Sequence, residues 1–174
     1  DDGRVKPDIV APGTHISGGV FQLAASVAAT GAAAACFDAR GVCGGLDASE
    51  FFPAGQQFYS ASSGTSHSAP AVAGGAALVR QHFVNNGLTA PSPAMTKAVL
   101  VNSARYMNGT GANDTLPSNG QGMGMMDLEA YFSQLAGPRI LLDQRPADLF
   151  TASGQQHTIT GTVADGGQPL RVTL

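Results

Sequence analysis

The feature that most constrains this chain is a run of small apolar residues between positions 66 and 84. Its first half leaves almost no polar face at helical spacing, and its polar side chains come only from position 80 onward. A helix that is apolar on every side is buried inside a protein. Because Pro70 is tolerated only within about the first helical turn, the helix is predicted to begin close to Ser66–Ser68. It is predicted to end at Asn85-Asn86-Gly87.

Weaker signals on both sides of this run predict two more helices and a long loop. One helix is predicted from Pro93 to about Ala104, with Ser92 as its N-cap. A shorter helix is predicted over about Asp127–Leu135, capped by Asp127. Residues 22–57 are rich in Ala, Gly and Ser and follow no period, which is typical of a long functional or inserted loop.

The pattern changes after residue 138. Residues 156–164 and 170–174 alternate apolar and polar side chains around Asp165-Gly166-Gly167, which predicts a β-hairpin. We therefore expect a domain boundary near 138–148, with one domain over 1–140 and the truncated start of a second over 141–174.

Composition excludes several classes of function. Charged residues make up only 12% of the chain and apolar residues 43%, which argues against a charge-driven disordered protein. The net charge is −3 and no Lys/Arg cluster occurs, so no nucleic-acid partner is expected. No stretch approaches the roughly 20 unbroken apolar residues of a membrane-spanning helix, so no membrane partner is expected either.

The two cysteines, Cys36 and Cys43, lie close together in a Gly-rich loop. Zinc would need two further ligands, and no His lies nearby in the sequence. The spacing favours a short-range disulfide, which would contribute roughly 2.5 kcal/mol in the chain-entropy model. Two free thiols remain the alternative. A disulfide would favour an exported protein.

A serine-rich segment over residues 62–68 stands where a loop meets the apolar helix. A helix N-terminus offers N–H donors without intrahelical partners and the positive end of a dipole, and both can stabilise an oxyanion. Gly64 removes a side chain, so a substrate backbone can come close, and Ser66 can be a nucleophile once a base lies beside it. From spacing alone, an ordinary Ser/Thr helix cap is the commoner explanation.

Two longer motifs change that balance. Residues 64–74, Gly-Thr-Ser-His-Ser-Ala-Pro-Ala-Val-Ala-Gly, closely resemble the nucleophile motif of the subtilisin-like serine proteases, G-T-S-x-x-x-P-x-V-A-G. Residues 6–13 match the K-P-D-I-V-A-P-G strand and turn of that family, in the right order and with 22–57 as a tolerated insertion. Sedolisins also use S-G-T-S, but the K-P-D-I-V-A-P-G segment and the V-A-G ending favour the subtilisins. The tail is similar to the start of a β-sandwich appended to some bacterial members.

The resemblance implies an α/β fold, namely part of a subtilisin-like parallel sheet with packed helices, followed by the first strands of a β-sandwich. It implies a secreted serine endopeptidase that hydrolyses peptide bonds of a polypeptide substrate through an acyl-enzyme, with no cofactor for the chemistry. Ser66 would be the nucleophile, and its own backbone N–H one oxyanion donor. His67 stands where the family commonly has Met. The expected oxyanion and substrate-cleft residues are Ser62, Ser63, Gly64, Thr65 and His67.

The partners of the nucleophile are missing from the sequence. A serine nucleophile needs a His base and an orienting carboxylate. The chain contains no D-[ST]-G and no H-G-T-x-V-A-G segment, and none of His15, His67, His82 and His157 has a matching context. We expect the His and Asp to come from the N-terminal half of the catalytic domain, as a companion chain or in the same precursor. The 174 residues alone are expected to be inactive.

Two further points follow from the resemblance. Structural calcium is common in the family, but Asp114, Asp127, Asp143 and Asp148 form no spaced ligand loop, so the sequence assigns no metal site. The expected location is extracellular or periplasmic. The competing class of function is a non-catalytic remnant or binding module in which Ser66 only caps a helix.

Overall fold

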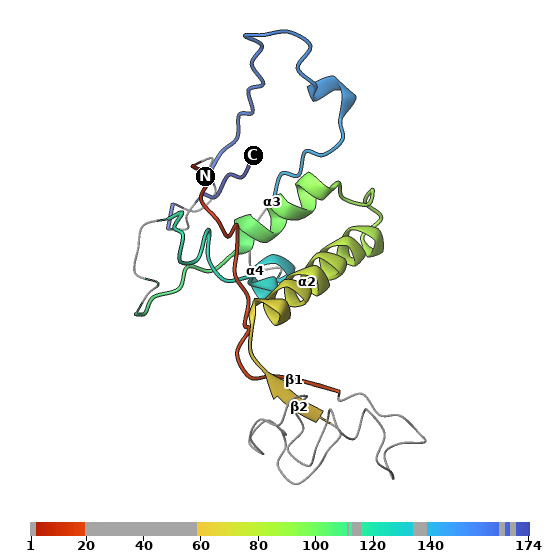
Figure 1. Ribbon diagram of the computed structural model, residues 1–174. Helices are drawn as coiled ribbons and strands as arrows, with labels where there is room; N and C mark the ends of the chain where they lie inside the picture. Colours follow the sequence, from red (N-terminus) through yellow and green to blue (C-terminus); the bar gives the residue numbers. More distant parts are fainter. Residues whose placement is uncertain are drawn as a thin grey trace, which may run out of the picture. The chain divides into compact units, whose positions relative to one another are not determined.

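The computed structural model describes residues 3–19, 59–110, 112, 116–133, 139–163, 166–167 and 170–174. Two strands, three α-helices and one short 3-10 helix follow one another along these residues (Figure 1). They are β1 (Ile16–Gly19), β2 (Tyr59–Ser62), α2 (Thr65–Asn85), α3 (Pro93–Ser103), α4 (Leu128–Phe132) and η3 (Pro146–Asp148). No helix in this described part has the length and apolar character to cross a membrane.

The chain divides into two compact units. One unit comprises Ala11–Ala71, and the other comprises Asp1–Val10 with Val72–Leu174. The boundary falls inside α2, so the first turns of this helix belong to the smaller unit and the remainder to the larger one.

Helix α2 begins and ends close to the predicted positions, at Thr65 and Asn85. Its end is a Schellman motif, in which Leu88 N donates to Phe83 O at 3.0 Å and Gly87 N donates to Val84 O at 3.1 Å. Gly87 has φ +70°, a conformation that glycine adopts without steric cost. The predicted Asn-Asn-Gly stop is therefore confirmed.

Helix α3 confirms its predicted cap and gains a second one from a distant segment. Ser92 Oγ accepts from Met95 N at 3.0 Å, and Pro93 is the first helical residue. Ser92 N and Ser92 Oγ also donate to the two oxygens of Asp143, at 2.8 and 2.6 Å. Burial alone would raise the pKa of Asp143, but the hydrogen bonds from Ser92 and Gln144 together outweigh burial and hold that pKa below its usual value.

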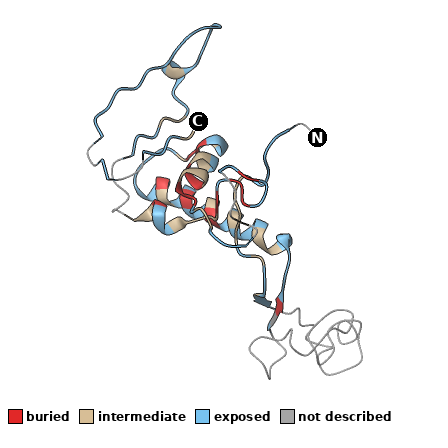
Figure 2. Ribbon diagram, turned by 90° about the vertical axis from the view of Figure 1, so that its left-hand side faces the viewer, coloured by how far each residue is buried: buried red, intermediate tan, exposed pale blue. Residues whose placement is uncertain are grey.

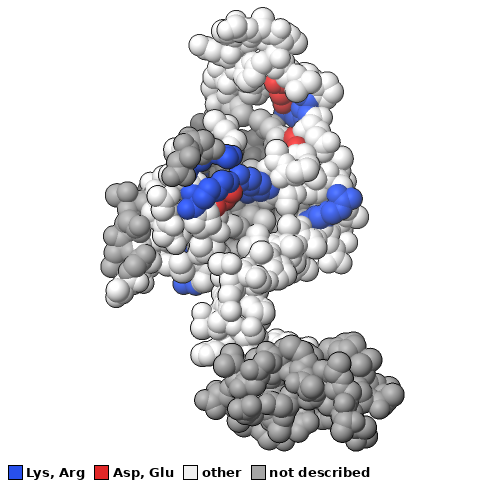
Figure 3. Space-filling model, viewed as in Figure 1, with Lys and Arg blue, Asp and Glu red and all other residues white. Residues whose placement is uncertain are grey.

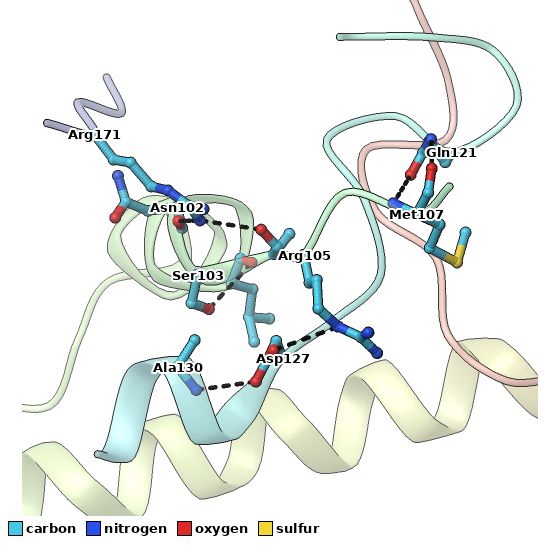
Figure 4. Close-up of polar contacts among 10 residues, drawn as sticks. Asn102, Ser103, Arg105, Met107, Gln121, Asp127, Ala130 and Arg171 are labelled. Atoms are coloured by element: carbon cyan, nitrogen blue, oxygen red, sulfur yellow. Dashed lines mark hydrogen bonds and ion pairs between the residues drawn. The ribbon is translucent and has the colours of Figure 1, made fainter. Parts of the chain in front are cut away.

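Helix α4 begins after Asp127, as predicted, and Asp127 Oδ1 accepts from Ala130 N at 2.9 Å (Figure 4). It ends at Phe132, earlier than the predicted Leu135. Residues 134–138 lie outside the described part of the chain.

The core lies where α2, α3 and α4 meet (Figure 2). Its buried residues are Val79, Phe83, Met95, Val99, Leu100 and Tyr131. The opposite side of α2 stays open, with 47% of Leu78 and 55% of Val84 exposed. A helix this apolar needs elements around it on every side, and among the described elements α3 and α4 cover only one of its faces.

The described strands are antiparallel, with Ile16 opposite Ser62 and Gly19 opposite Tyr59. Among the residues that the structure describes, the predicted parallel pairing is limited to one bridge between Val10 and Met125. Around it, Met123 N donates to Asp8 O at 2.9 Å, and Met126 N donates to Val10 O at 2.9 Å. The apolar run at the start of the chain thus lies beside residues 123–126.

The predicted hairpin in the tail is not formed: none of the described residues beyond 139 is in a strand. Two strands without a third strand or a helix against them are marginally stable in water. The tail is attached instead through Arg171, whose guanidinium donates to Asn102 O at 3.0 Å and to Ala104 O at 3.1 Å (Figure 4). These carbonyls end α3, where a cation is favourable.

Charged side chains are sparse on the face drawn in Figure 3, and the acidic ones lie next to basic ones. The carboxylate of Asp8 lies 2.6 Å from Lys6 Nζ and 2.9 Å from Lys97 Nζ. Hydrogen bonds from Lys6 and then Lys97 lower the pKa of Asp8. These ion pairs are exposed, so they contribute little to stability.

Candidate active site

The serine singled out by the sequence lies at a tight junction between a strand and a helix. Strand β2 ends at Ser62 and helix α2 begins at Thr65, so only Ser63 and Gly64 separate the two elements. Ser66 is exposed in the first turn of α2. We call residues 63–66 the nucleophile turn. Among the described residues, which include all four histidines, none hydrogen-bonds to Ser66.

A second turn, at Pro12-Gly13, lies directly against the nucleophile turn. Gly64 N donates to Gly13 O at 2.7 Å. A Cβ at position 13 would collide with Ser68 Oγ and lie 2.8 Å from Gly64 O, so only glycine fits. The sequence predicted a turn at the Pro12-Gly13 dipeptide but no role for Gly13 at the site.

Strand β1 also holds the nucleophile turn. His15 N donates to Ser63 Oγ at 2.9 Å, just before the β1–β2 pairing begins at Ile16. The side chain of Ser63 is thereby fixed by the backbone of a segment far away in the sequence. No sequence signal pointed to this bond, because it depends on a register that only the folded chain defines.

His67 turns back toward Ser62. Its Nε2 lies 2.9 Å from Ser62 Oγ, and its Cδ2 would be 3.9 Å from a Cβ built at Gly64. His67 N also donates to Gly64 O at 3.0 Å. The ring therefore lies beside the nucleophile turn and contacts Ser62. The structure brings all the predicted cleft residues together in this one segment, namely Ser62, Ser63, Gly64, Thr65 and His67.

The electrostatics of the turn favour an anion. The first four N–H groups of a helix have no intrahelical carbonyl partner, and Ser66 is the second residue of α2. The first turn of α2 carries no acidic side chain that would offset the positive end of the helix dipole. If Ser66 Oγ attacked a carbonyl carbon, the negative charge that developed on the carbonyl oxygen would therefore lie near oriented backbone N–H donors.

The other histidines have separate surroundings. His82 packs against Tyr131 and Phe132, with ring centroids 5.3 and 5.2 Å apart. His157 Nδ1 lies 3.8 Å from Asp148 Oδ1. His15 is exposed and contributes its backbone to the site.

The candidate calcium ligands are engaged elsewhere. Asp127 caps α4 and lies 3.7 Å from Arg105 Nε, Asp143 binds Ser92, and Asp148 pairs with Arg145 at 2.9 Å. No group of three or more metal-ligating side chains occurs in the described part of the chain. The described carboxylates thus do not fit a calcium site. Asp114, Cys36 and Cys43 lie outside the described residues.

The model of the subtilase family matches residues 1–124, which include the Lys6–Gly13 segment and the whole nucleophile turn. No curated protein matches the chain.

Proposed function

The chain belongs to the subtilase family, and we propose that it is the C-terminal portion of a secreted subtilisin-like serine endopeptidase. The observation that carries this proposal is the exposed Ser66 in the first turn of α2, on a turn fixed by Gly13. An ordinary helix cap would turn its side chain toward the helix N–H groups. Ser66 lies inside the helix, and no hydrogen bond joins its side-chain hydroxyl to another described residue.

The proposed reaction is an acyl transfer. Ser66 Oγ attacks a peptide carbonyl, the amine of the substrate leaves, and water hydrolyses the acyl-enzyme. The N–H of Ser66 donates to the oxyanion. The His base, its Asp and a second oxyanion donor come from the N-terminal half of the catalytic domain, because the chain holds no segment with their motifs.

The open face of α2 supports a missing companion. Leu78 and Val84 are about half exposed on a helix whose sequence is apolar on almost every side. We propose that the N-terminal half of the domain, as a companion chain or in the same precursor, covers this face and completes the parallel sheet. Burying apolar surface stabilises such a complex by about 25 cal/mol per Å².

Two finer parts of the proposal concern the tail and the location. The tail exposes alternate apolar residues, with 54% of Ile159, 60% of Val163 and 71% of Val172 accessible. This alternation supports residues 141–174 as the first strands of a β-sandwich. The proposed location is extracellular or periplasmic, where a Cys36–Cys43 disulfide would persist.

A fluorophosphonate probe tests the proposal. The probe reacts with a serine only when a base activates it, so we expect label on the Ser66 peptide in a protein that contains both halves of the domain. The 174-residue chain alone should remain unlabelled by intact mass, and Ser66→Ala should abolish labelling of the longer protein. Absence of label from the longer protein would show that Ser66 is only a structural residue of a non-catalytic remnant.

A further inference from the structure

His67 connects the two sides of the nucleophile turn. Ser62 is the last residue of β2, and His67 is in the first turn of α2. The 2.9 Å contact between Ser62 Oγ and His67 Nε2 therefore closes a ring around Ser63, Gly64, Thr65 and Ser66. The Cδ2 position, next to Nε2, places the edge of the imidazole beside Gly64.

The other contacts of the turn act on a different part of it. Gly13 O holds Gly64 N, and His15 N holds Ser63 Oγ, so both fix the strand side of the turn from outside. Besides the backbone bond from His67 N to Gly64 O, the contact between Ser62 and His67 is the side-chain contact among the described residues that ties that side directly to the helix that carries Ser66. A glycine in the turn makes such a tie valuable, because glycine loses more conformational freedom on folding than any other residue.

We propose that His67 is a positioning residue that holds the nucleophile turn closed through Ser62, an inference that rests on the proposed role of Ser66. The tie forms with either neutral tautomer and with the charged ring, because a hydroxyl both donates and accepts. A methionine at this position could not replace it, since a thioether is only a weak acceptor. His67 acts on Ser66 through the backbone, with its ring bound to Ser62.

Amide hydrogen exchange on the 174-residue chain tests the tie directly. The reporters are the amides of Gly64 and of residue 67, which bond Gly13 O and Gly64 O. His67→Phe and Ser62→Ala should each speed their exchange about three- to tenfold, the worth of one neutral hydrogen bond. The double variant should exchange no faster than either single variant. His67→Gln, whose amide can reach the position of Nε2, should restore the protection.

A matched control is His82→Phe, which removes a histidine from the far end of the same helix and should leave both amides unchanged. Unchanged exchange in both His67→Phe and Ser62→Ala would overturn the proposal. If His67→Phe perturbs folding, the exchange rates of Ser62→Ala alone decide the test. A failure of His67→Gln to restore protection would also contradict it, because ring packing would then explain the effect.

The catalytic consequence is measured in the protein that contains both halves of the domain. His67→Phe should lower kcat about three- to tenfold with KM little changed, and His67→Gln should recover kcat. An equal rise in KM with kcat unchanged would contradict positioning. If Ser66 is never labelled in any variant while the exchange effects are present, the proposed function fails and the tie between Ser62 and His67 stands.

Discussion

The side chain of Gln121 provides the sharpest test of how this chain is stabilised. It is fully buried and is bound to the loop that follows α3. Its Oε1 accepts from Met107 N at 2.7 Å, and its Nε2 donates to Met107 O at 3.0 Å (Figure 4). Its Nε2 also donates to Ala112 O at 2.6 Å. We predict that Gln121→Leu, which preserves most of the volume and removes all three bonds, strongly destabilises the fold.

The magnitude follows from the groups left behind. The substitution leaves the N–H and the carbonyl of Met107 without a partner, whereas Ala112 O keeps its hydrogen bond from the Tyr106 hydroxyl at 3.1 Å. Each lost partner costs about 1–3 kcal/mol when the group is buried. Met107 is only partly buried, so the lower end applies and the sum is about 2 kcal/mol. Leucine fits the space left by glutamine closely enough that a cavity adds little.

Urea unfolding followed by far-ultraviolet circular dichroism measures this loss. With a slope of about 2 kcal/mol/M, the midpoint should fall by about 1 M while the slope stays unchanged. Gln81→Leu is the matched control, because Gln81 is exposed on α2, and it should change stability by less than about 0.5 kcal/mol. A loss of less than about 1 kcal/mol for Gln121→Leu would refute the reasoning, because the three bonds would then be replaceable by water.

Three other outcomes are expected. The pKa of Asp143 is held below its usual value of 3.8, so its charge stabilises the fold above that pH and this stability is lost as the pH falls below it. Asp143→Asn should remove this part of the acid dependence of urea stability, and an unaltered profile would count against the Ser92 contact. Gly13→Ala should speed amide exchange at Gly64 about tenfold or more, since overpacking costs about 1–3 kcal/mol; exchange at the original rate would show that Ser68 moves aside freely. The active enzyme should outlast its His67→Met variant in dilute peroxide, because methionine oxidises to a polar sulfoxide, and equal decay of activity would contradict this.

Local signals predicted the helices well. Ser92-Pro93 and Asp127 are caps whose physics is contained in a few neighbouring residues, and the structure confirms both. The Asn-Asn-Gly stop of α2 is local in the same way. The nucleophile turn could also be located from sequence, because the resemblance spans the strand end, the glycine and the start of the helix.

Long-range contacts were beyond the reach of the sequence. The carboxylate of Asp143 completes the cap of a helix that begins far earlier in the chain, and His15 reaches Ser63 through strand register. The open face of α2 at Leu78 has a related cause, because periodicity shows which faces of a helix need cover and does not supply the covering elements. The tail hairpin failed for a similar reason, since alternation in sequence does not provide a third strand.

The pairing of Asp8 and Val10 with residues 123–126 has a consequence for the order of events during synthesis. A ribosome adds about 5–20 residues per second, so the first partner waits roughly ten seconds for the second to emerge. During that interval the apolar segment around Val10 has an open edge, which is a hazard for association with other nascent chains. Contacts of such high sequence separation also slow folding after release. Productive folding of this subtilase segment therefore depends on what shields residues 5–11 while translation continues.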